Sequence, residues 1–301
     1  MLGQKSIHAE DCFAGGFVGT DFGIRLDLTD KLPEEWRAFH KEFIPIYLEN
    51  HKEKTKVAAG LACAAIWTVS KGMLQGDIVL CPDGVGQYSA GEITGGYTYS
   101  PKKILPHRRP VRWLDQTISR SDMSESLRNS CGRPGTVATV TKHTEEINQL
   151  LHGKAAPHIV STDESIEDPA TFALEKHLED FLIKNWSGTE LSCDFDIIEE
   201  NGELVGQQFP TDTGPIDILA ISKDRKILLV IELKKGRASD VVVGQLLRYM
   251  SYVRDELAEP EQSVRGVVIA LDENHRLRRA LAMVPEIDFY RYEVSFRLVK
   301  S

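Results

Sequence analysis

The chain has 301 residues, of which 42% are hydrophobic and 27% are charged, and its formal net charge is −9. This composition is typical of a soluble globular protein with room for two domains, and we expect no membrane association because no apolar run is long enough to cross a bilayer. The negative net charge excludes a general affinity for nucleic acid, although a local basic groove is still compatible with it.

The five cysteines are scattered along the chain without C-x-x-C spacing. Their odd number and irregular spacing argue against a disulfide framework and against a structural zinc site. The N-terminus also lacks the basic-then-apolar pattern of a secretory signal. We therefore expect a cytoplasmic protein.

Residues 1–152 are predicted to form an N-terminal domain of helices and short strands. Apolar residues at helical spacing predict helices at 33–50 and 55–70. Short segments between Gly- and Pro-containing turns predict strands at 77–81, 87–94, 97–99 and 110–114. Such short, regularly spaced strands are typical of a small β-barrel or a curled sheet.

After these strands the sequence predicts two helices and then a linker. Residues 119–130 form a helical pattern in which Asp122 and Glu125 have the spacing of a capping box. Another helix is expected at 143–152. The stretch 153–169 is polar, contains two prolines and four acids, and lacks periodicity, which indicates a linker between two domains.

Residues 170–301 behave as one α/β or α+β unit in which helices and strands alternate. Helices are predicted at 172–185, 240–257 and 273–283. Strands are predicted at 191–199, 214–221, 226–234, 264–271 and 290–299.

Two neighbouring strands of this unit carry charged residues among apolar ones. Asp217 lies in the segment I-D-I-L-A-I, and Glu232 and Lys234 lie in the segment L-L-V-I-E-L-K. A charge beside an apolar layer is costly unless it meets a partner, a metal or water. Glu232 and Lys234 are two residues apart and share one face of their strand, and a hairpin through 222–226 would bring Asp217 beside them.

Two carboxylates and a lysine in this arrangement suit phosphate chemistry. The acids can hold Mg²⁺, with Mn²⁺ as an expected substitute, while the amine positions or deprotonates a water or supports charge on a phosphate. The alternative is a structural group, in which Glu232 and Lys234 form an ion pair on a solvated strand edge and Asp217 is a carboxylate near a turn.

Two helices of this unit add further candidate residues. Glu175 and Glu179 lie on nearly the same face of the first helix, and we favour Glu175 as the acid that reaches the metal. Asp240 has the residue type and position of an N-cap for the second helix. One stripe of that second helix is polar and could grip a phosphate or orient a water; it consists of Gln245, Arg248, Tyr249 and Tyr252.

The segments G-P-I-D-I-L-A, L-L-V-I-E-L-K-K-G-R and G-Q-L-L-R-Y together resemble the PD-(D/E)xK nuclease core. The similarity is greatest to the C-terminal nuclease domain of NucS/EndoMS endonucleases and related restriction-type proteins, and it covers residues 170–301. It implies a restriction-endonuclease-like mixed sheet flanked by helices, and Mg²⁺-dependent hydrolysis of DNA phosphodiester bonds. One departure is Ile216, which stands where the family name has proline. The implied roles are metal binding by Asp217, Glu232 and Glu175, catalysis by these three with Lys234 and Gln245, and nucleic-acid contact by Arg237, Arg248 and Tyr249.

The N-terminal domain contains a basic stretch in a chain that is acidic overall. Residues 102–133 hold eight Lys and Arg against three acids, with aromatic residues interleaved. Cations that pair with phosphates and rings that stack on bases are what DNA contact requires. DNA contact is therefore expected of Arg108, Arg109 and Arg112.

A second resemblance concerns residues 66–139, where the stretch from G-D-I-V-L-C-P to H-R-R-P-V-R-W-L is similar to PUA/EVE-type small barrels. It implies a pocket for an extruded or modified base. The candidate walls of this pocket are Trp67, Tyr97, Tyr99 and Trp113. The alternatives are that these rings form the core of the sheet and that the basic stretch is a solvated face.

These observations favour a metal-dependent DNA endonuclease of restriction, defence or DNA repair, in which an N-terminal module reads DNA and the C-terminal domain cleaves it. A homodimer is expected because a double-strand break requires two active sites. The alternative is a non-catalytic nucleic-acid-binding or adaptor protein on a nuclease-like fold. A remoter alternative is an enzyme that acts on RNA.

Overall fold

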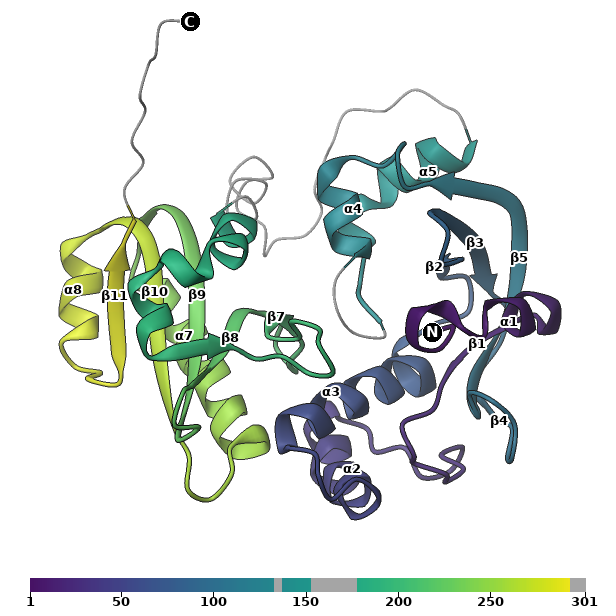
Figure 1. Cartoon of the computed structure of the whole chain (residues 1–301), viewed down its shortest axis with the longest axis horizontal. Helices are drawn as coiled ribbons and strands as arrows, with labels where there is room; N and C mark the ends of the chain where they lie inside the picture. Colours follow the sequence, from purple (N-terminus) through teal and green to yellow (C-terminus); the bar gives the residue numbers. More distant parts are fainter. Residues whose placement is uncertain (133–136, 153–177, 293–301) are drawn as a thin grey trace, which may run out of the picture. The chain divides into compact units, whose positions relative to one another are not determined.

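The computed structural model of the chain describes residues 1–132, 137–152 and 178–292 (Figure 1). The chain divides into two units, Met1–Val160 and Ser161–Ser301. The division lies within the stretch 153–169 that the sequence predicts as a linker, and this stretch itself lies outside the described residues. Each unit has its own sheet and its own hydrophobic clusters, and each is described by itself.

The first unit is built on an antiparallel sheet in the order β1-β5-β3-β2, with β4 also paired to β5. The strands are β1 (Phe17–Thr20), β2 (Ile78–Pro82), β3 (Gln87–Ile93), β4 (Thr98–Tyr99) and β5 (His107–Ser119). The long strand β5 pairs with β1 and β4 at its start and with β3 over the rest of its length (Figure 1). Within the described residues the edge strands β1 and β2 do not pair with each other, so the sheet is curled but open.

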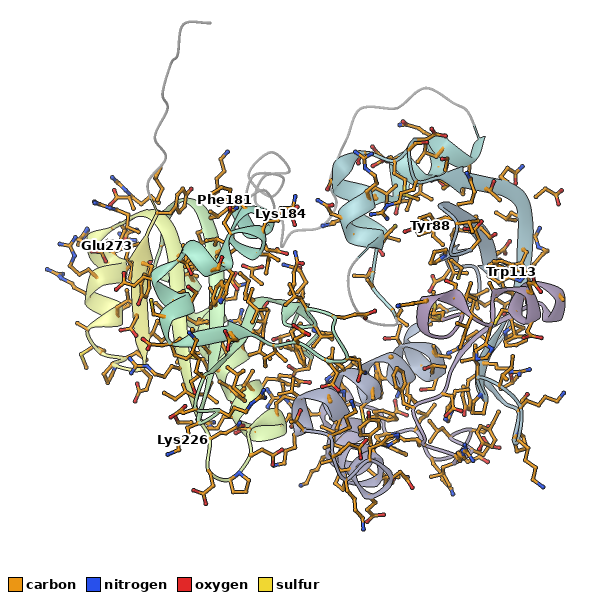
Figure 2. All side chains as sticks on the ribbon, viewed as in Figure 1. Tyr88, Trp113, Phe181, Lys184, Lys226 and Glu273 are labelled. Atoms are coloured by element: carbon orange, nitrogen blue, oxygen red, sulfur yellow. The ribbon has the colours of Figure 1, made fainter. Side chains whose placement is uncertain are left out.

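Helices pack around this sheet in separate hydrophobic clusters. They are α1 (Ala9–Gly15), α2 (Trp36–Asn50), α3 (Lys56–Trp67), α4 (Glu125–Cys131) and α5 (Thr144–His152), with short helical turns at Gln4–Ser6, Thr68–Gly72 and Thr141–His143. In one cluster the rings of Phe39 and Phe43 on α2 pack against small residues of α3. In another, Leu127 of α4 and Ile147 of α5 pack against Tyr88 of β3 (Figure 2).

Two sequence predictions for the first unit were wrong at the level of element ends. The helix predicted at 119–130 begins only at Glu125, because β5 continues as far as Ser119. Its N-cap is Ser124, whose Oγ accepts a hydrogen bond from the Leu127 N–H at 3.1 Å, so Asp122 is not the capping residue. The helix α1 and the strand β1 have no counterpart among the predicted elements.

The second unit contains a mixed sheet in the order β11-β10-β9-β8-β6, with β7 paired to β8. The strands are β6 (Phe195–Ile197), β7 (Gln207–Phe209), β8 (Ile216–Ser222), β9 (Ile227–Ala238), β10 (Ser263–Glu273) and β11 (Ile287–Arg291). β8 and β9 form an antiparallel hairpin, whereas β9, β10 and β11 run parallel to one another. This confirms the predicted mixed sheet.

Helices lie on both faces of the second sheet (Figure 1). They are the helix at 178–184, α7 (Val241–Tyr252) and α8 (His275–Leu281), with short helical turns at Trp186–Gly188, Glu190–Cys193 and Val253–Leu257. Leu229 and Ile231 of β9 belong to the cluster of the 178–184 helix. On the opposite face α7 approaches β10 closely at Gly266, where a Cβ would lie 2.7 Å from the Met250 sulfur. Flanking helices, the other part of the predicted fold class, are thus confirmed.

Several element ends in the second unit also differ from the sequence predictions. The strand predicted at 191–199 begins as a helical turn and becomes extended only at Phe195. Asp240 precedes α7, but its side chain makes no capping hydrogen bond, so it is an N-cap by position alone. The strand β7 was not predicted. Among the described residues no helix combines the length and the apolar character that crossing a membrane requires.

Candidate active site

The β8–β9 hairpin brings the predicted acidic residues together. Ile218 pairs with Ile231, and one further step along each strand places Asp217 opposite Glu232. The Leu233 N–H donates a hydrogen bond of 2.8 Å to Asp217 Oδ2, which ties this carboxylate to the backbone of β9. The predicted juxtaposition of the two strands is confirmed, and the chemical roles of their side chains stay predictions.

Glu232 and Lys234 share one face of β9, as their spacing predicts. The ammonium of Lys234 lies 3.0 Å from Glu232 Oε1. The Glu232 side chain is only 3% exposed, whereas that of Lys234 is 29% exposed. The lysine therefore compensates a buried carboxylate and still keeps access to the surface.

A third carboxylate joins this group from the helix at 178–184. Glu179 is 4% exposed, and the side-chain amide of Gln208 connects its Oε2 to Asp217 Oδ1 through hydrogen bonds of 2.5 Å and 3.0 Å. Glu175, the helix acid favoured from the sequence, lies outside the described residues. Of the two alternatives, Glu179 is therefore the one for which the structure gives a contact to the site.

Burial and like charges dominate the electrostatics of the site. Burial raises the pKa of Asp217 well above its usual range, and the negative charges of Glu232 and Glu179 raise that pKa further. The hydrogen bond from Leu233 and the positive charge of Lys234 lower the same pKa and only partly offset the rise. Carboxylates held this close favour a cation between them.

The donor set fits a hard divalent cation that keeps part of its water shell. Among the residues that the structure describes, no set of three or more His, Cys, Asp and Glu side chains is arranged to enclose a metal. Mg²⁺ does not need such a cage, because it is commonly held by one or two carboxylates together with waters and substrate phosphates. Asp217 and Glu232 offer two carboxylates on neighbouring strands, and metal binding by them stays a prediction.

Helix α7 contributes a tyrosine to the same group. Tyr249 is buried, and its hydroxyl lies 3.4 Å from Gln245 Nε2. Burial raises the pKa of Tyr249, the Gln245 hydrogen bond lowers it, and the nearby charges of Glu232 and Asp217 raise it. A Cβ at Gly214 would lie 3.1 Å from this hydroxyl, so the loop before β8 closes tightly on the tyrosine.

The two arginines predicted to contact nucleic acid in this unit lie at its surface. Arg248 is exposed on α7. Arg237 is exposed at the end of β9 and pairs with Asp272 at 2.8 Å. Both are accessible, and their role in DNA contact stays a prediction.

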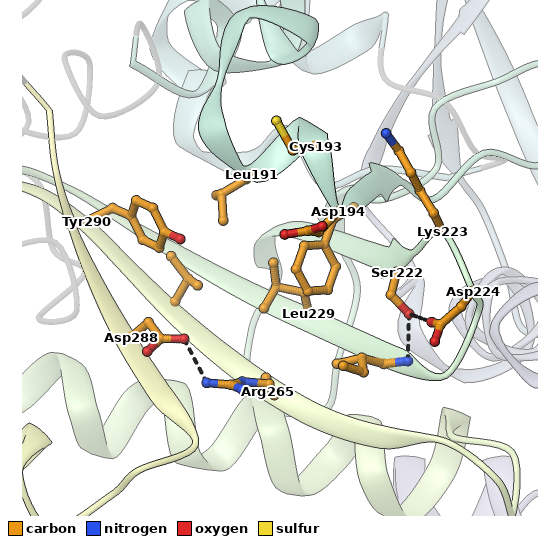
Figure 3. A pocket seen from close by; sticks show the side chains of 13 residues that line it. Leu191, Cys193, Asp194, Ser222, Lys223, Asp224, Leu229, Arg265, Asp288 and Tyr290 are labelled. Atoms are coloured by element: carbon orange, nitrogen blue, oxygen red, sulfur yellow. Dashed lines mark hydrogen bonds and ion pairs between the residues drawn. The ribbon is translucent and has the colours of Figure 1, made fainter.

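A separate cavity of about 560 Å³ lies at the turn end of the β8–β9 hairpin (Figure 3). Its lining includes Ser222 of that turn, Tyr290 and the ion pair between Arg265 and Asp288, whose atoms are 2.9 Å apart. Asp217 and Glu232 occupy the opposite, open end of the hairpin. The cavity is therefore not part of the candidate active site.

The predicted DNA contacts of the first unit need correction at Arg109. Its guanidinium is buried, 7% exposed, and donates hydrogen bonds to the carbonyls of Val69, Ser70 and Gly95. These bonds use three of its five N–H donors inside the protein, so the buried Arg109 supports the fold of the first unit. The prediction was wrong because a run of basic residues does not reveal which side of a strand each one faces.

The other two arginines differ from Arg109. Arg108 is half-buried, stacks over the ring of Phe17 and donates to backbone carbonyls of the preceding loop. Arg112 is exposed and pairs with Glu92. Of the three, Arg112 is the one best placed to meet a ligand from solution.

The four rings proposed as walls of a base pocket pack in more than one place in the first unit. Trp67 and Tyr97 pack at the edge of the α2–α3 cluster. Trp113 (labelled in Figure 2) packs against a different cluster, where its Nε1 donates to the Cys12 carbonyl at 3.1 Å. Tyr97 also bonds His107 Nδ1 at 2.8 Å, and Tyr99 lies against the same imidazole. These contacts show what the four rings pack against, and their role as walls of a base pocket stays a prediction.

Sequence reasoning missed two residues of the candidate site, Gln207 and Gln208. Both amides donate to Glu179, Gln207 at 2.6 Å and Gln208 at 2.5 Å. They lie on the unpredicted strand β7, which has only three residues. A strand of three residues is too short to show a periodic pattern in the sequence. Nor does the sequence indicate that this strand lies next to the 178–184 helix, which is distant in the chain.

Comparisons with known proteins match each unit separately. Residues 175–293 match the family model of the endonuclease NucS C-terminal domain. Residues 2–141 match the model of a domain of unknown function, DUF8426. The second unit is thus similar to the endonuclease NucS C-terminal domain. The PUA/EVE likeness of the first unit finds no support in these matches and stays a prediction.

The curated relatives include proteins named endonuclease NucS. That of Methanocaldococcus jannaschii is 35% identical over 75 residues, which are 25% of this chain and 27% of the relative. That of Sulfolobus acidocaldarius is 26% identical over 168 residues, 55% of this chain and 59% of the relative. The chain thus spans between about a quarter and three fifths of the length of these relatives.

The solved structures to which the chain is similar include the following two. A repair endonuclease from Pyrococcus abyssi has a TM-score of 0.32 and 15% identity, with 72% of this chain and 65% of that chain covered. A complex of EndoMS with double-stranded DNA has a TM-score of 0.32 and 16% identity, with 73% and 66% covered.

Proposed function

We propose that the second unit is the catalytic unit of a divalent-metal-dependent endonuclease that hydrolyses DNA phosphodiester bonds, in DNA repair or in restriction. The observation that carries this proposal is the meeting of Asp217, Glu232 and Lys234 at the open end of one hairpin. The match of residues 175–293 to the NucS C-terminal domain, and the relatives named endonuclease NucS, support it.

Asp217 and Glu232 would hold the metal ion, with Glu179 as the nearby helix acid. A bound Mg²⁺, or Mn²⁺ in its place, supplies a Lewis acid that makes a water more acidic and offsets negative charge on the phosphate. Burial and the negative charges of Glu232 and Glu179 raise the pKa of Asp217, and a bound cation would favour its ionised form.

Lys234 would act as a charged group on the substrate. Its ion pair with Glu232, at 3.0 Å, favours the protonated amine, so electrostatic support of the phosphate is a better role for it than proton abstraction. Because its ammonium is partly exposed, it can reach a phosphate that approaches from solvent. There it would stabilise the charge that develops as water attacks phosphorus and the bond to the leaving oxygen breaks.

The N–H of Leu233 and the amide of Gln208 each donate to one oxygen of Asp217. These bonds fix the direction of the carboxylate before substrate arrives, which is the kind of support that functional carboxylates need. The hydroxyl of Tyr249 lies in the same charged environment and would help to orient a water or a phosphate oxygen.

We further propose that the first unit reads DNA and that the enzyme acts as a homodimer. The exposed side chain of Arg112 and the exposed Lys102 and Lys103 are the groups that favour DNA contact. Dimerisation would supply the second active site that a double-strand break requires. Sedimentation of the full chain with and without duplex DNA tests the oligomeric state.

Cleavage of unmodified, methylated, glucosylated, mismatched and branched DNA, in Mg²⁺, Mn²⁺ or EDTA, tests the activity. We expect cleavage of at least one substrate that EDTA abolishes. Asp217→Ala and Glu232→Ala should each lower the rate by about 10²–10³-fold or more, in the range seen when one electrostatic group of an active site is removed. DNA affinity should stay nearly unchanged in both variants.

The matched control is Glu261→Ala, which removes an exposed carboxylate from a turn of the same unit. It should cleave at the normal rate. If the wild type binds DNA but cleaves none of these substrates in either metal, the non-catalytic alternative replaces the proposal. RNA of the same sequences, offered in parallel, identifies an RNA-directed enzyme.

A further inference from the structure

Gln208 links two carboxylates that come from different parts of the second unit. Its Nε2 carries two hydrogens, and the hydrogen bonds go to Glu179 Oε2 at 2.5 Å and to Asp217 Oδ1 at 3.0 Å. Glu179 belongs to the 178–184 helix and Asp217 to β8. One amide thus joins the helix acid to the strand acid.

The orientation of this amide follows from its partners. Both partner atoms are carboxylate oxygens, which accept hydrogen bonds and cannot donate them when ionised. If the amide were turned over, its Oε1 would face two negative groups and be repelled by both. With both carboxylates ionised, which is the form that binds a cation, the charges select the donating orientation.

The backbone of Gln208 is held in an unusual conformation. Its φ is 50°, in the left-handed region, although it is not a glycine. Its neighbours are both fixed by β8, since Gln207 pairs with Ile218 and Phe209 pairs with Ile216. Residues in such strained conformations persist where the surrounding structure holds them, and they gather at functional sites.

We propose that Gln208 is a positioning residue of the metal site, whose amide holds Glu179 and Asp217 in the relative orientation that a divalent cation requires. This inference rests on the proposed function. Each carboxylate oxygen has two lone pairs, so a hydrogen bond from Gln208 does not by itself prevent the same oxygen from binding a cation. Partners of this kind, outside the set of ligands, commonly change metal affinity by 10- to 100-fold.

The adjacent residue provides a matched control. Gln207 has the same side chain on the same short strand, but its amide donates to Glu179 at 2.6 Å and to Asp180 at 3.3 Å. It therefore contacts the helix acid and does not link that acid to Asp217. Replacing either residue removes one side-chain amide from β7. Only the replacement of Gln208 removes the link between Glu179 and Asp217.

The test measures Mn²⁺ binding by the full chain, by titration calorimetry and by the loss of the free-ion electron spin resonance signal. Gln208→Met keeps the length of the side chain but removes both donors. We expect its Mn²⁺ affinity to fall about 10- to 100-fold. The affinity should fall less in Gln207→Met, which loses hydrogen bonds to Glu179 and Asp180 but keeps the link to Asp217. In cleavage assays the Mn²⁺ concentration for half-maximal rate should rise in Gln208→Met, with the rate at saturating Mn²⁺ largely kept.

A second variant guards against a simple folding defect. Gln208→Asn keeps an amide and suits a left-handed backbone, but it is one methylene too short to reach both acids. It should fold normally by circular dichroism and still bind Mn²⁺ more weakly than the wild type. Affinities of the Met and Asn variants equal to that of the wild type would overturn the inference. Tighter Mn²⁺ binding by these variants would also overturn it, because the Gln208 amide would then compete with the ion for the carboxylate oxygens.

Asp217→Ala separates this inference from the proposed function. If the wild type binds Mn²⁺ and Asp217→Ala does not, the metal site stands, and the Gln208 variants decide the inference alone. If the wild type binds no Mn²⁺, or binds it equally well without Asp217, the proposed function and this inference both fail.

Discussion

Replacing Arg109 by alanine tests whether this residue of the basic stretch stabilises the first unit or binds DNA. Two of the Arg109 hydrogen bonds are short, 2.6 Å to the Val69 carbonyl and 2.8 Å to the Ser70 carbonyl, and the third, to Gly95, is 3.4 Å. A hydrogen bond from a charged group contributes about 1.5–3 kcal/mol, and the carbonyls would be left buried without their donor. We therefore expect Arg109→Ala to lower the free energy of unfolding of the first unit by about 3–5 kcal/mol.

Differential scanning calorimetry of the full chain measures this effect. For a unit of this size the melting temperature should fall by about 10 °C. Three of the four tryptophans, Trp36, Trp67 and Trp113, belong to the first unit, so fluorescence follows its unfolding, while the second unit provides an internal reference.

Arg112→Ala is the control for the loss of a positive charge. Arg112 is exposed and its ion pair with Glu92 lies at the surface, where such pairs contribute about 0–1 kcal/mol. This variant should keep its melting temperature. The reasoning about Arg109 is refuted if Arg109→Ala melts like the wild type and instead binds DNA more weakly, with a salt dependence reduced by about one ion.

Two further predictions concern stability. A Cβ at Gly206 would lie 2.1 Å from the Leu219 carbonyl oxygen, so Gly206→Ala should destabilise the second unit by about 3 kcal/mol in urea unfolding, whereas Gly188→Ala, with open space at its Cβ, should be neutral. Burial lowers the pKa of His40 from 6.5 to about 3, so below pH 6.5 the unfolded chain takes up a proton that the folded chain does not. The first unit should then lose up to about 1.4 kcal/mol per pH unit between pH 6.5 and pH 3, and a His40→Phe variant that melts with the same pH slope would contradict this.

The geometry of the β8–β9 hairpin could be predicted because its charged residues stand out locally. Glu232 and Lys234 interrupt a strand of Ile, Leu and Val at a spacing of two, and this spacing alone places them on one face. The turn at 222–226 is short, so the two strands of the hairpin must run side by side. Asp217 is therefore expected to lie beside the part of the second strand that carries Glu232 and Lys234. These inferences use neighbours in the chain or a single tight turn, and the structure confirms the geometry.

The arrangement of the first unit could not be predicted in the same way. Arg109 and Arg112 belong to the same basic stretch of the sequence. The side chain of Arg109 is nevertheless buried and bonded to three carbonyls, whereas that of Arg112 is exposed. Which of them meets solvent depends on the helical turn after α3 that packs over the strand, and this contact joins residues that are about 40 positions apart. Trp67 and Trp113 were assigned to one pocket for the same reason, although they lie in different clusters.

The amino-acid sequence by itself determined the two-part organisation, the mixed sheet of the second unit and the hairpin that carries Asp217, Glu232 and Lys234. Tertiary structure alone decided that Glu179 and Gln208 join them, and that Arg109 is a structural residue. The physical reason is the range of the interactions. Strand periodicity and tight turns act over a few residues, whereas a hydrogen bond between distant segments forms only after the whole unit has folded and brought them together.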